Sequence, residues 1–85
     1  NAVVIAHELL HTLGASDKYD PQSLAPVFPE GYAEPDRQPL HPQRQAEIMA
    51  GRFALSEELL AMPDRLGQAL IGPQTAAEIG LLRAD

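Results

Sequence analysis

Proline is concentrated in one stretch of this sequence, and that stretch cannot be helical. Six of the eight prolines lie between residues 15 and 43: Pro21, Pro26, Pro29, Pro35, Pro39 and Pro42. A proline ring removes a backbone donor and clashes with the preceding helical turn. We therefore predict an irregular surface loop over residues 15–43. The apolar and aromatic residues that favour a packed loop over a flexible linker are Leu24, Val27, Phe28, Tyr32 and Leu40.

The residues before this loop predict a helix. Residues 1–13 contain no proline or glycine, and apolar side chains fall on nearly every side of a helical projection. That pattern is typical of a buried helix. Gly14 comes next, and a glycine in this position is a common helix stop.

The residues after the loop predict more helix. We expect a helical turn at residues 43–47, a tight bend at 47–51 that Gly51 permits, and helices within 56–82. Ser56 is placed as the N-cap of a helix through Ala61, with the Glu57–Glu58 pair in its acidic first turn and the pair Leu55 and Leu60 as its hydrophobic staple.

The last helix is predicted to begin near Pro73 and to run to about Leu82. Thr75 and Glu78 have the spacing of a capping box if this helix starts slightly later. The chain as a whole is therefore expected to be mostly α-helix and long loop.

Composition limits the classes of function. Eighty-five residues with 45% hydrophobic content support one small domain or part of one. No cysteine is present, so a metal must be held by imidazole, carboxylate or backbone oxygen. The net charge is −6 and the basic residues are scattered, which argues against nucleic-acid binding. No apolar run is long enough to span a bilayer, so no membrane contact is expected within this segment.

The start of the sequence suggests a fragment. Asn1 is not an initiator Met, and an apolar stretch follows at once. We therefore expect upstream residues, which leaves a signal peptide, a membrane anchor or a propeptide open.

The segment from His7 to His11, which reads His-Glu-Leu-Leu-His, carries the chemistry. Residues four apart lie one turn above each other on a helix, so the two imidazoles can reach one ion. Glu8 points about 100° away around the axis, where its carboxylate can accept a proton from a metal-activated water. We predict His7 and His11 as zinc ligands and Glu8 as the general base.

Asp17 is the predicted third ligand. A glycine three residues after His11 lets the chain turn back, and a carboxylate oxygen suits Zn²⁺. The alternative for Asp17 is a turn residue without metal, since Asp favours turns. The substitute ligands would then be Asp20, Glu34 and His41.

The run from His7 to Asp17 resembles the extended zinc-binding motif of metzincin proteases, in the variant of snapalysin-type enzymes that closes with Asp. Met49, within residues 47–51, is similar to the methionine of the turn that these proteases place beneath the zinc. The resemblance spans Ala6 to Gly51, about half of the chain. Several metzincins carry a Tyr two residues after that Met, whereas this sequence has Gly51.

The resemblance implies an α+β metzincin-like zincin catalytic domain, of which residues 1–85 would be a single partial domain. It implies a zinc-dependent endopeptidase acting on peptide or protein substrates, in a secreted, periplasmic or membrane-anchored setting. Tyr19, Tyr32 and Arg52 are candidates for stabilising the transition state. The alternatives are a non-catalytic zinc-binding module, an inactive protease fragment and a zinc site that only stabilises folding. Met49 also fits as a plain core residue.

Overall fold

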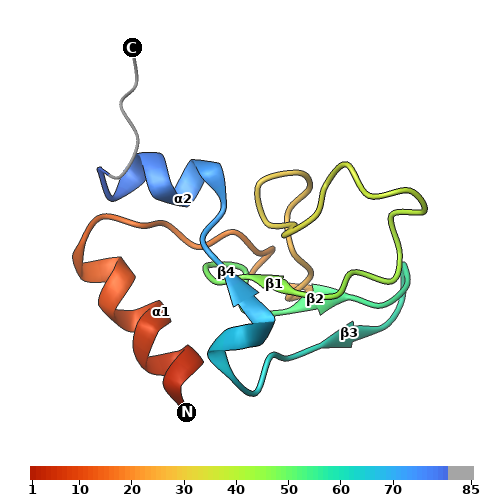
Figure 1. Ribbon diagram of the computed structural model, residues 1–85, viewed down its shortest axis with the longest axis horizontal. Coiled ribbons are helices and arrows are strands. Elements are labelled where there is room, and N and C mark those ends of the chain that lie inside the picture. The colour runs from red at the N-terminus through yellow and green to blue at the C-terminus, as the bar shows by residue number, and fades with distance from the viewer. Residues whose placement is uncertain (81–85) are drawn as a thin grey trace.

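The computed structural model describes residues 1–80, which form two helices and four very short strands (Figure 1). Helix α1 spans Ala2–Thr12 and helix α2 spans Pro73–Glu78. The remaining regular structure consists of β1 (Ala46–Glu47), β2 (Phe53–Ala54), β3 (Leu60–Ala61), a 3₁₀ turn (Leu66–Gln68) and β4 (Ala69–Leu70). Most of the chain between α1 and α2 is therefore loop and turn. None of the described helices is long and apolar enough to cross a membrane.

Helix α1 lies where the sequence predicts it, and both of its ends are capped. The side chain of Asn1 accepts a hydrogen bond from the Val4 amide at 3.0 Å. At the other end Gly14 has a φ of 108°, its amide donates to the His11 carbonyl, and the Ala15 amide donates to the Leu10 carbonyl. These two bonds form a Schellman motif. The predicted stop at Gly14 is confirmed, and it turns the chain back toward the helix.

The prediction that α1 is buried on all sides is wrong. Val3 and Leu10 face the core, whereas the side chains of Ile5, Leu9 and Leu13 are 70%, 60% and 56% exposed. These three residues are four apart and form one stripe on the outer side of the helix. A chain this small covers only one face of its first helix.

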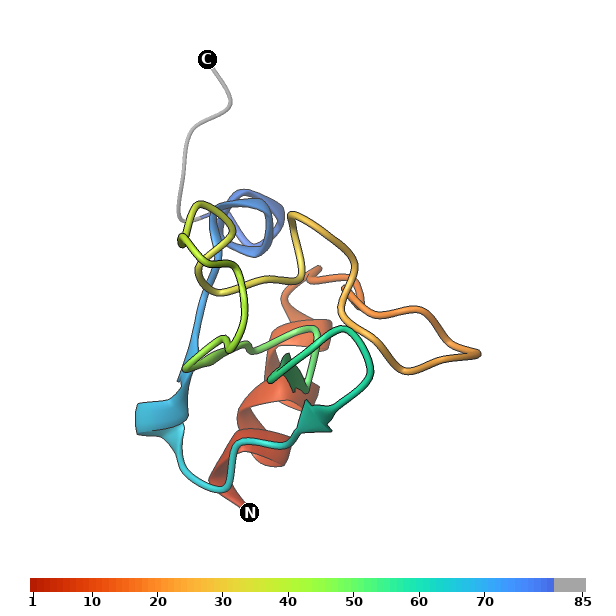
Figure 2. The same cartoon turned by 90° about the vertical axis from the view of Figure 1, so that its right-hand side faces the viewer.

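The predicted loop at residues 15–43 is irregular, as expected, and its first part, orange in Figure 2, extends away from the rest of the protein. Backbone pairing holds it, through isolated bridges between Tyr19 and Pro26 and between Tyr32 and Ala46. The apolar side chains predicted to pack the loop do not all do so, since Leu24, Val27 and Phe28 are 39%, 44% and 56% exposed: the fold fixes this loop mainly by hydrogen bonds.

Strands β1 and β4 pair in parallel, with Ala46 opposite Ala69. The helical turn predicted for residues 43–47 is therefore wrong, because a chain segment far away in sequence supplies the backbone partners of β1. The predicted bend follows β1: the amides of Ala50 and Gly51 both donate to the Glu47 carbonyl, and Gly51 has a φ of 76°. A core of apolar side chains joins this turn to α1, namely Leu10, Ala15, Ile48 and Met49.

The helix predicted from Ser56 to Ala61 is also wrong. Strands β2 and β3 pair antiparallel, so these residues form a hairpin. The Ser56 hydroxyl accepts from the amides of Glu58 and Leu59. A serine N-cap makes the same side-chain to backbone hydrogen bonds at the start of a helix. A helix cap and a tight turn of this kind therefore have the same sequence signature. The Glu57–Glu58 pair consequently lies in a turn rather than in the first turn of a helix, and Leu55 and Leu60 form no helix staple.

Helix α2 begins at Pro73, as predicted, but without the capping box. Gly72 is its N-cap, and the buried Thr75 hydroxyl has no hydrogen-bond partner among the described residues. Glu78 turns instead toward the residues after α1. The predicted run to about Leu82 is wrong at its end, because α2 stops at Glu78 with Ile79 as its C-cap, and Gly80 has a φ of 86°. Residues 81–82 lie outside the described residues.

Replacing Gly14 by Ala should destabilise the fold by about 1–2 kcal/mol, because an L-residue is strained in the left-handed region. The added Cβ would also lie 3.2 Å from the Glu78 carbonyl oxygen. Urea unfolding followed by circular dichroism measures this. Gly67→Ala is the control, since its Cβ meets nothing within 4 Å. Equal stability of the two variants would contradict this account of the helix end.

Candidate metal centre

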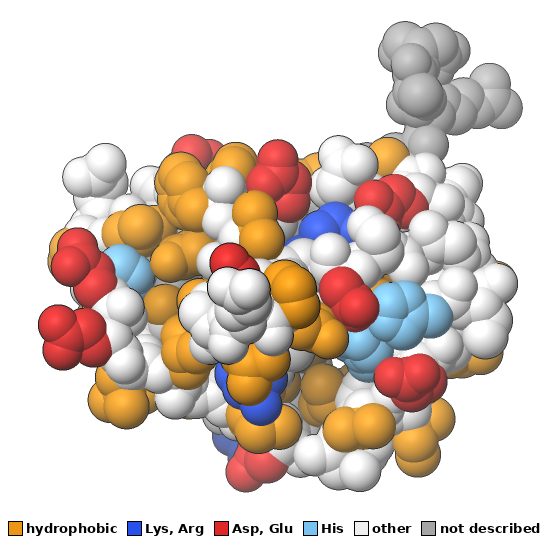
Figure 3. All heavy atoms as spheres, turned by 180° about the vertical axis from the view of Figure 1, so that it is seen from behind, with side chains coloured by type: hydrophobic (Ala, Val, Ile, Leu, Met, Phe, Trp, Pro, Cys, Tyr) orange, Lys and Arg blue, Asp and Glu red, His pale blue; other side chains and the backbone are white. Residues whose placement is uncertain are grey.

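His7 and His11 direct their Nε2 atoms at each other from successive turns of α1. The two atoms are 3.1 Å apart, and the ring planes are nearly perpendicular. Both side chains are partly buried, with 16% of His7 and 32% of His11 exposed. Figure 3 shows histidine atoms gathered at the surface beside acidic side chains, toward the right of that view. The spacing of four thus produces the convergence that the sequence predicts.

Backbone carbonyls fix the protonation of both rings. The Nδ1 of His7 lies 2.8 Å from the Ile48 oxygen, and the Nδ1 of His11 lies 2.9 Å from the Ala15 oxygen. A carbonyl can only accept, so each Nδ1 carries the proton and donates. In the neutral rings both Nε2 atoms then present lone pairs, which is how metal-binding histidines are oriented.

Asp17 completes the group. Its Oδ1 lies 2.9 Å from the Nε2 of His11 and 3.2 Å from the Nε2 of His7. Three acceptor atoms therefore lie within 3.2 Å of one another. A single proton can form a hydrogen bond between two of these atoms, but the lone pair of the third atom then faces another lone pair. A metal cation between the three atoms would contact all of them.

These distances fit Zn²⁺. Ligands at about 2.0–2.1 Å in tetrahedral geometry are about 3.3 Å apart, slightly more than the separations found here. Two imidazoles and one carboxylate are a ligand set that zinc accepts, whereas Mg²⁺ and Ca²⁺ prefer oxygen alone. The residues that would hold the ion are His7, His11 and Asp17.

Glu8 is close to this group but is not its nearest carboxylate. One of its oxygens lies within 4.8 Å of donor atoms of both histidines, and the side chain is exposed. Glu8 and Asp17 therefore compete for the role of third ligand. The shorter distances favour Asp17 for that role, and Glu8 lies beside the site and is open to solvent.

Glu78 holds the chain on both sides of Asp17. Its carboxylate accepts from the amide and the hydroxyl of Ser16, each at 2.9 Å, and from the Lys18 ammonium at 2.6 Å. Burial raises the pKa of Glu78, but the bonds from Lys18 and Ser16 outweigh it and bring that pKa to about 2. No local pattern in the sequence indicates this role, because Glu78 is about 60 positions away from Ser16 and Lys18.

A second buried carboxylate supports His7. Glu47 is fully buried, and its two oxygens accept from the amides of Met49 and Gly72. It thereby shapes the turn whose Ile48 carbonyl binds His7. Met49 itself is completely buried, in the same core cluster as Leu10 and Ile48. Sequence analysis singled out Met49 by its similarity to the methionine of the metzincin turn, but it gave no role to Glu47.

The three side chains predicted to stabilise the transition state line two different cavities. Tyr19 and Arg52 line a cavity that also contains His7. Tyr32 packs against Phe28, and its hydroxyl is 3.5 Å from the Nε2 of His41, in a different cavity. The structure therefore brings Tyr19, but not Tyr32, to the cavity of His7.

The substitute ligands are engaged elsewhere. The Asp20 carboxylate accepts from the amides of Gln22 and Ser23 in its own turn. Glu34 pairs with Arg44, and His41 is beside Tyr32. None of these three substitutes therefore takes the place of Asp17 beside the histidines.

Comparison of the chain with protein-family models, curated proteins and solved structures found no match.

Asp17→Asn should weaken zinc binding by more than the roughly 10- to 100-fold typical of losing an outer-shell partner, since it removes a charged ligand. Competition with a chromophoric chelator measures the affinity. Asp20→Asn, with the same chemical change in a nearby turn, should bind like the parent. Identical affinities for the two variants would exclude Asp17 as a ligand.

Glu78→Gln should be less stable than the parent above about pH 4.5, and this difference should shrink as the pH falls toward about 2. The folded-state pKa lies below the ordinary value, so the stabilisation is complete above the ordinary value and is lost as the pH falls through the folded one. Urea unfolding of the metal-free protein across the acid range measures it, with Glu57→Gln as control. A difference that does not change with pH would contradict the ionic role of Glu78.

Proposed function

We propose that this chain is a zinc-dependent endopeptidase of the metzincin kind. The observation that carries the proposal is the convergence of two imidazole lone pairs and one carboxylate oxygen within 3.2 Å. The resemblance of the run from His7 to Asp17 to the metzincin motif supports it. So does the complete burial of Met49 in a core cluster that includes Leu10 of α1.

Zn²⁺ on these three side chains would supply Lewis-acid activation of a water molecule and of the peptide carbonyl. The rest of the work falls to the protein. The Ile48 and Ala15 carbonyls keep Nδ1 of the two rings protonated and their Nε2 atoms free. The Glu78 carboxylate binds Ser16 and Lys18 and so keeps Asp17, which lies between them, within reach of both rings.

Glu8 would act as general base and then as general acid. Its carboxylate lies beside the two histidines and faces solvent. It accepts a proton from the attacking water as the new carbon–oxygen bond forms. It then donates that proton to the leaving amine nitrogen as the carbon–nitrogen bond breaks. The second proton of the water passes from the new carboxyl group to the amine, so the products leave as a carboxylate and an ammonium, and Glu8 returns to its starting state.

Glu8→Gln should retain zinc and lose peptide cleavage by at least about 100-fold, the lower range for losing a general base. A fluorogenic peptide library, assayed with zinc and again with a chelator, measures the activity. Glu57→Gln, an exposed carboxylate in the hairpin turn, is the control. A zinc-loaded Glu8→Gln protein that cleaves as fast as the parent would refute the assignment.

A non-catalytic zinc-binding module would keep the same three ligands. It would bind zinc without cleaving any peptide, so the same assay distinguishes the two functions.

A further inference from the structure

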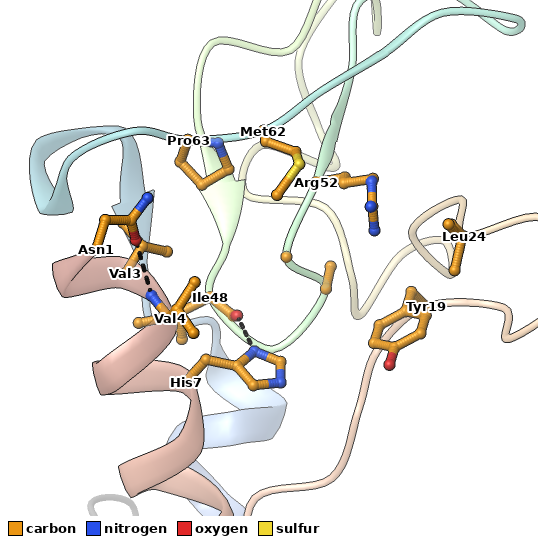
Figure 4. Close-up of a pocket in the computed structure, with 12 residues that line it drawn as sticks. Asn1, Val3, Val4, His7, Tyr19, Leu24, Ile48, Arg52, Met62 and Pro63 are labelled. Carbon is orange, nitrogen blue, oxygen red and sulfur yellow. Dashed lines mark hydrogen bonds between the residues drawn. The ribbon is translucent and has the colours of Figure 1, made fainter.

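A cavity of about 230 Å³ opens beside His7 (Figure 4). Its walls come from the start of α1, the turn after Met49 and the segment after β3. Most of the lining is apolar, contributed by Val3, Val4, Leu24, Ile48, Met62 and Pro63. An apolar cavity of about 150 Å³ is enough to admit benzene, so this one can take a leucine or phenylalanine side chain.

Arg52 is the only basic side chain in this lining. Figure 4 shows it on the same side of the cavity as Tyr19 and Leu24, across from Asn1 and Val4. It is partly buried. A guanidinium at the wall of an apolar cavity has lost part of its hydration, so a carboxylate there gains more from pairing with it than at an open surface.

Arg52 also lacks an acidic partner within residues 1–80. Among the other described basic residues, Lys18 pairs with Glu78 and Arg44 pairs with Glu34. Arg37 and Arg65 also have no described carboxylate within 4.0 Å, but Arg37 donates to the Pro42 carbonyl and Arg65 is exposed. Arg52 differs from both because it lies at the wall of an apolar cavity, with no described carboxylate within 4.0 Å of its guanidinium. A partly buried cation in that place, beside the predicted zinc ligands, points to an anion supplied from outside.

We propose that this cavity selects the substrate: an apolar side chain fills it, and Arg52 pairs with a carboxylate next to that side chain. This inference rests on the proposed peptidase function and adds the class of substrate. Because His7 lines the same cavity, a bound side chain places its own peptide bond near the histidines. The carboxylate is either an Asp or Glu side chain within the peptide or the α-carboxyl group of its last residue.

Binding to the zinc-loaded Glu8→Gln protein tests this without turnover. The probes are two pairs of fluorescent hexapeptides. In the first pair both ends are blocked and a leucine is followed by glutamate or by glutamine. In the second pair the leucine is the last residue, with a free carboxylate or an amide. The carboxylate member of at least one pair should bind about 10- to 100-fold more tightly, the range of a hydrogen bond to a charged group. The pair that shows this difference identifies the source of the carboxylate.

The difference should disappear when Arg52→Gln is added and persist when Arg65→Gln is added, because Arg65 is exposed and lies outside the cavity. If Arg52→Gln does not fold, Arg52→Lys keeps the charge without the two-pronged geometry and should shrink the difference. Replacing the leucine by glycine should weaken binding of every probe.

Equal binding within both pairs would overturn the proposal, as would a difference that survives in the variant lacking Arg52. These outcomes are separate from failure of the proposed function. Carboxylate-dependent binding by a protein that shows no zinc-dependent cleavage would overturn the peptidase and leave the Arg52 site standing.

Discussion

The structure depends on one electrostatic constraint, which is the close approach of three electron-rich atoms. The Nε2 atoms of His7 and His11 and the Oδ1 of Asp17 are mutually within 3.2 Å. Such an arrangement is unfavourable unless positive charge lies between the atoms. The fold around it keeps each ring from turning away, because the opposite nitrogen of each imidazole donates to a backbone carbonyl.

Short helix α2 fixes this arrangement from both of its ends. At its start, the Gly72 amide donates to Glu47, which also accepts from Met49 and so shapes the turn that supports His7. At its end, Glu78 binds the residues on either side of Asp17. A buried carboxylate, Glu47, and a half-buried one, Glu78, thus connect one helix to two of the predicted ligands. The site is therefore built by tertiary contacts, although its three residues lie close together in the sequence.

The sequence predicted those parts of the fold that local chemistry decides. Gly14 and Gly51 both adopt the positive φ that their bends require. The spacing of His7, His11 and Asp17 predicted their convergence, because helix periodicity and one glycine turn are enough to produce it. The ligand role itself stays a prediction.

The sequence failed where distant partners decide the outcome. Ser56 carries the same local signature for a helix cap and for a hairpin turn, and pairing of β3 with β2 decides between them. The local spacing predicts that Glu78 caps its own helix. In the structure its carboxylate instead accepts hydrogen bonds from the Ser16 amide and the Lys18 ammonium. No local pattern indicates that Glu47 will be buried, because its partner Gly72 belongs to another part of the chain.

X-ray absorption at the zinc edge of the loaded protein tests the central claim most directly. The account predicts two nitrogen ligands from imidazole and one carboxylate oxygen, all at about 2.0–2.2 Å, with the carboxylate signal lost in Asp17→Ala. A spectrum with only one imidazole, or one that does not change in Asp17→Ala, would contradict the convergence of these three side chains on one ion.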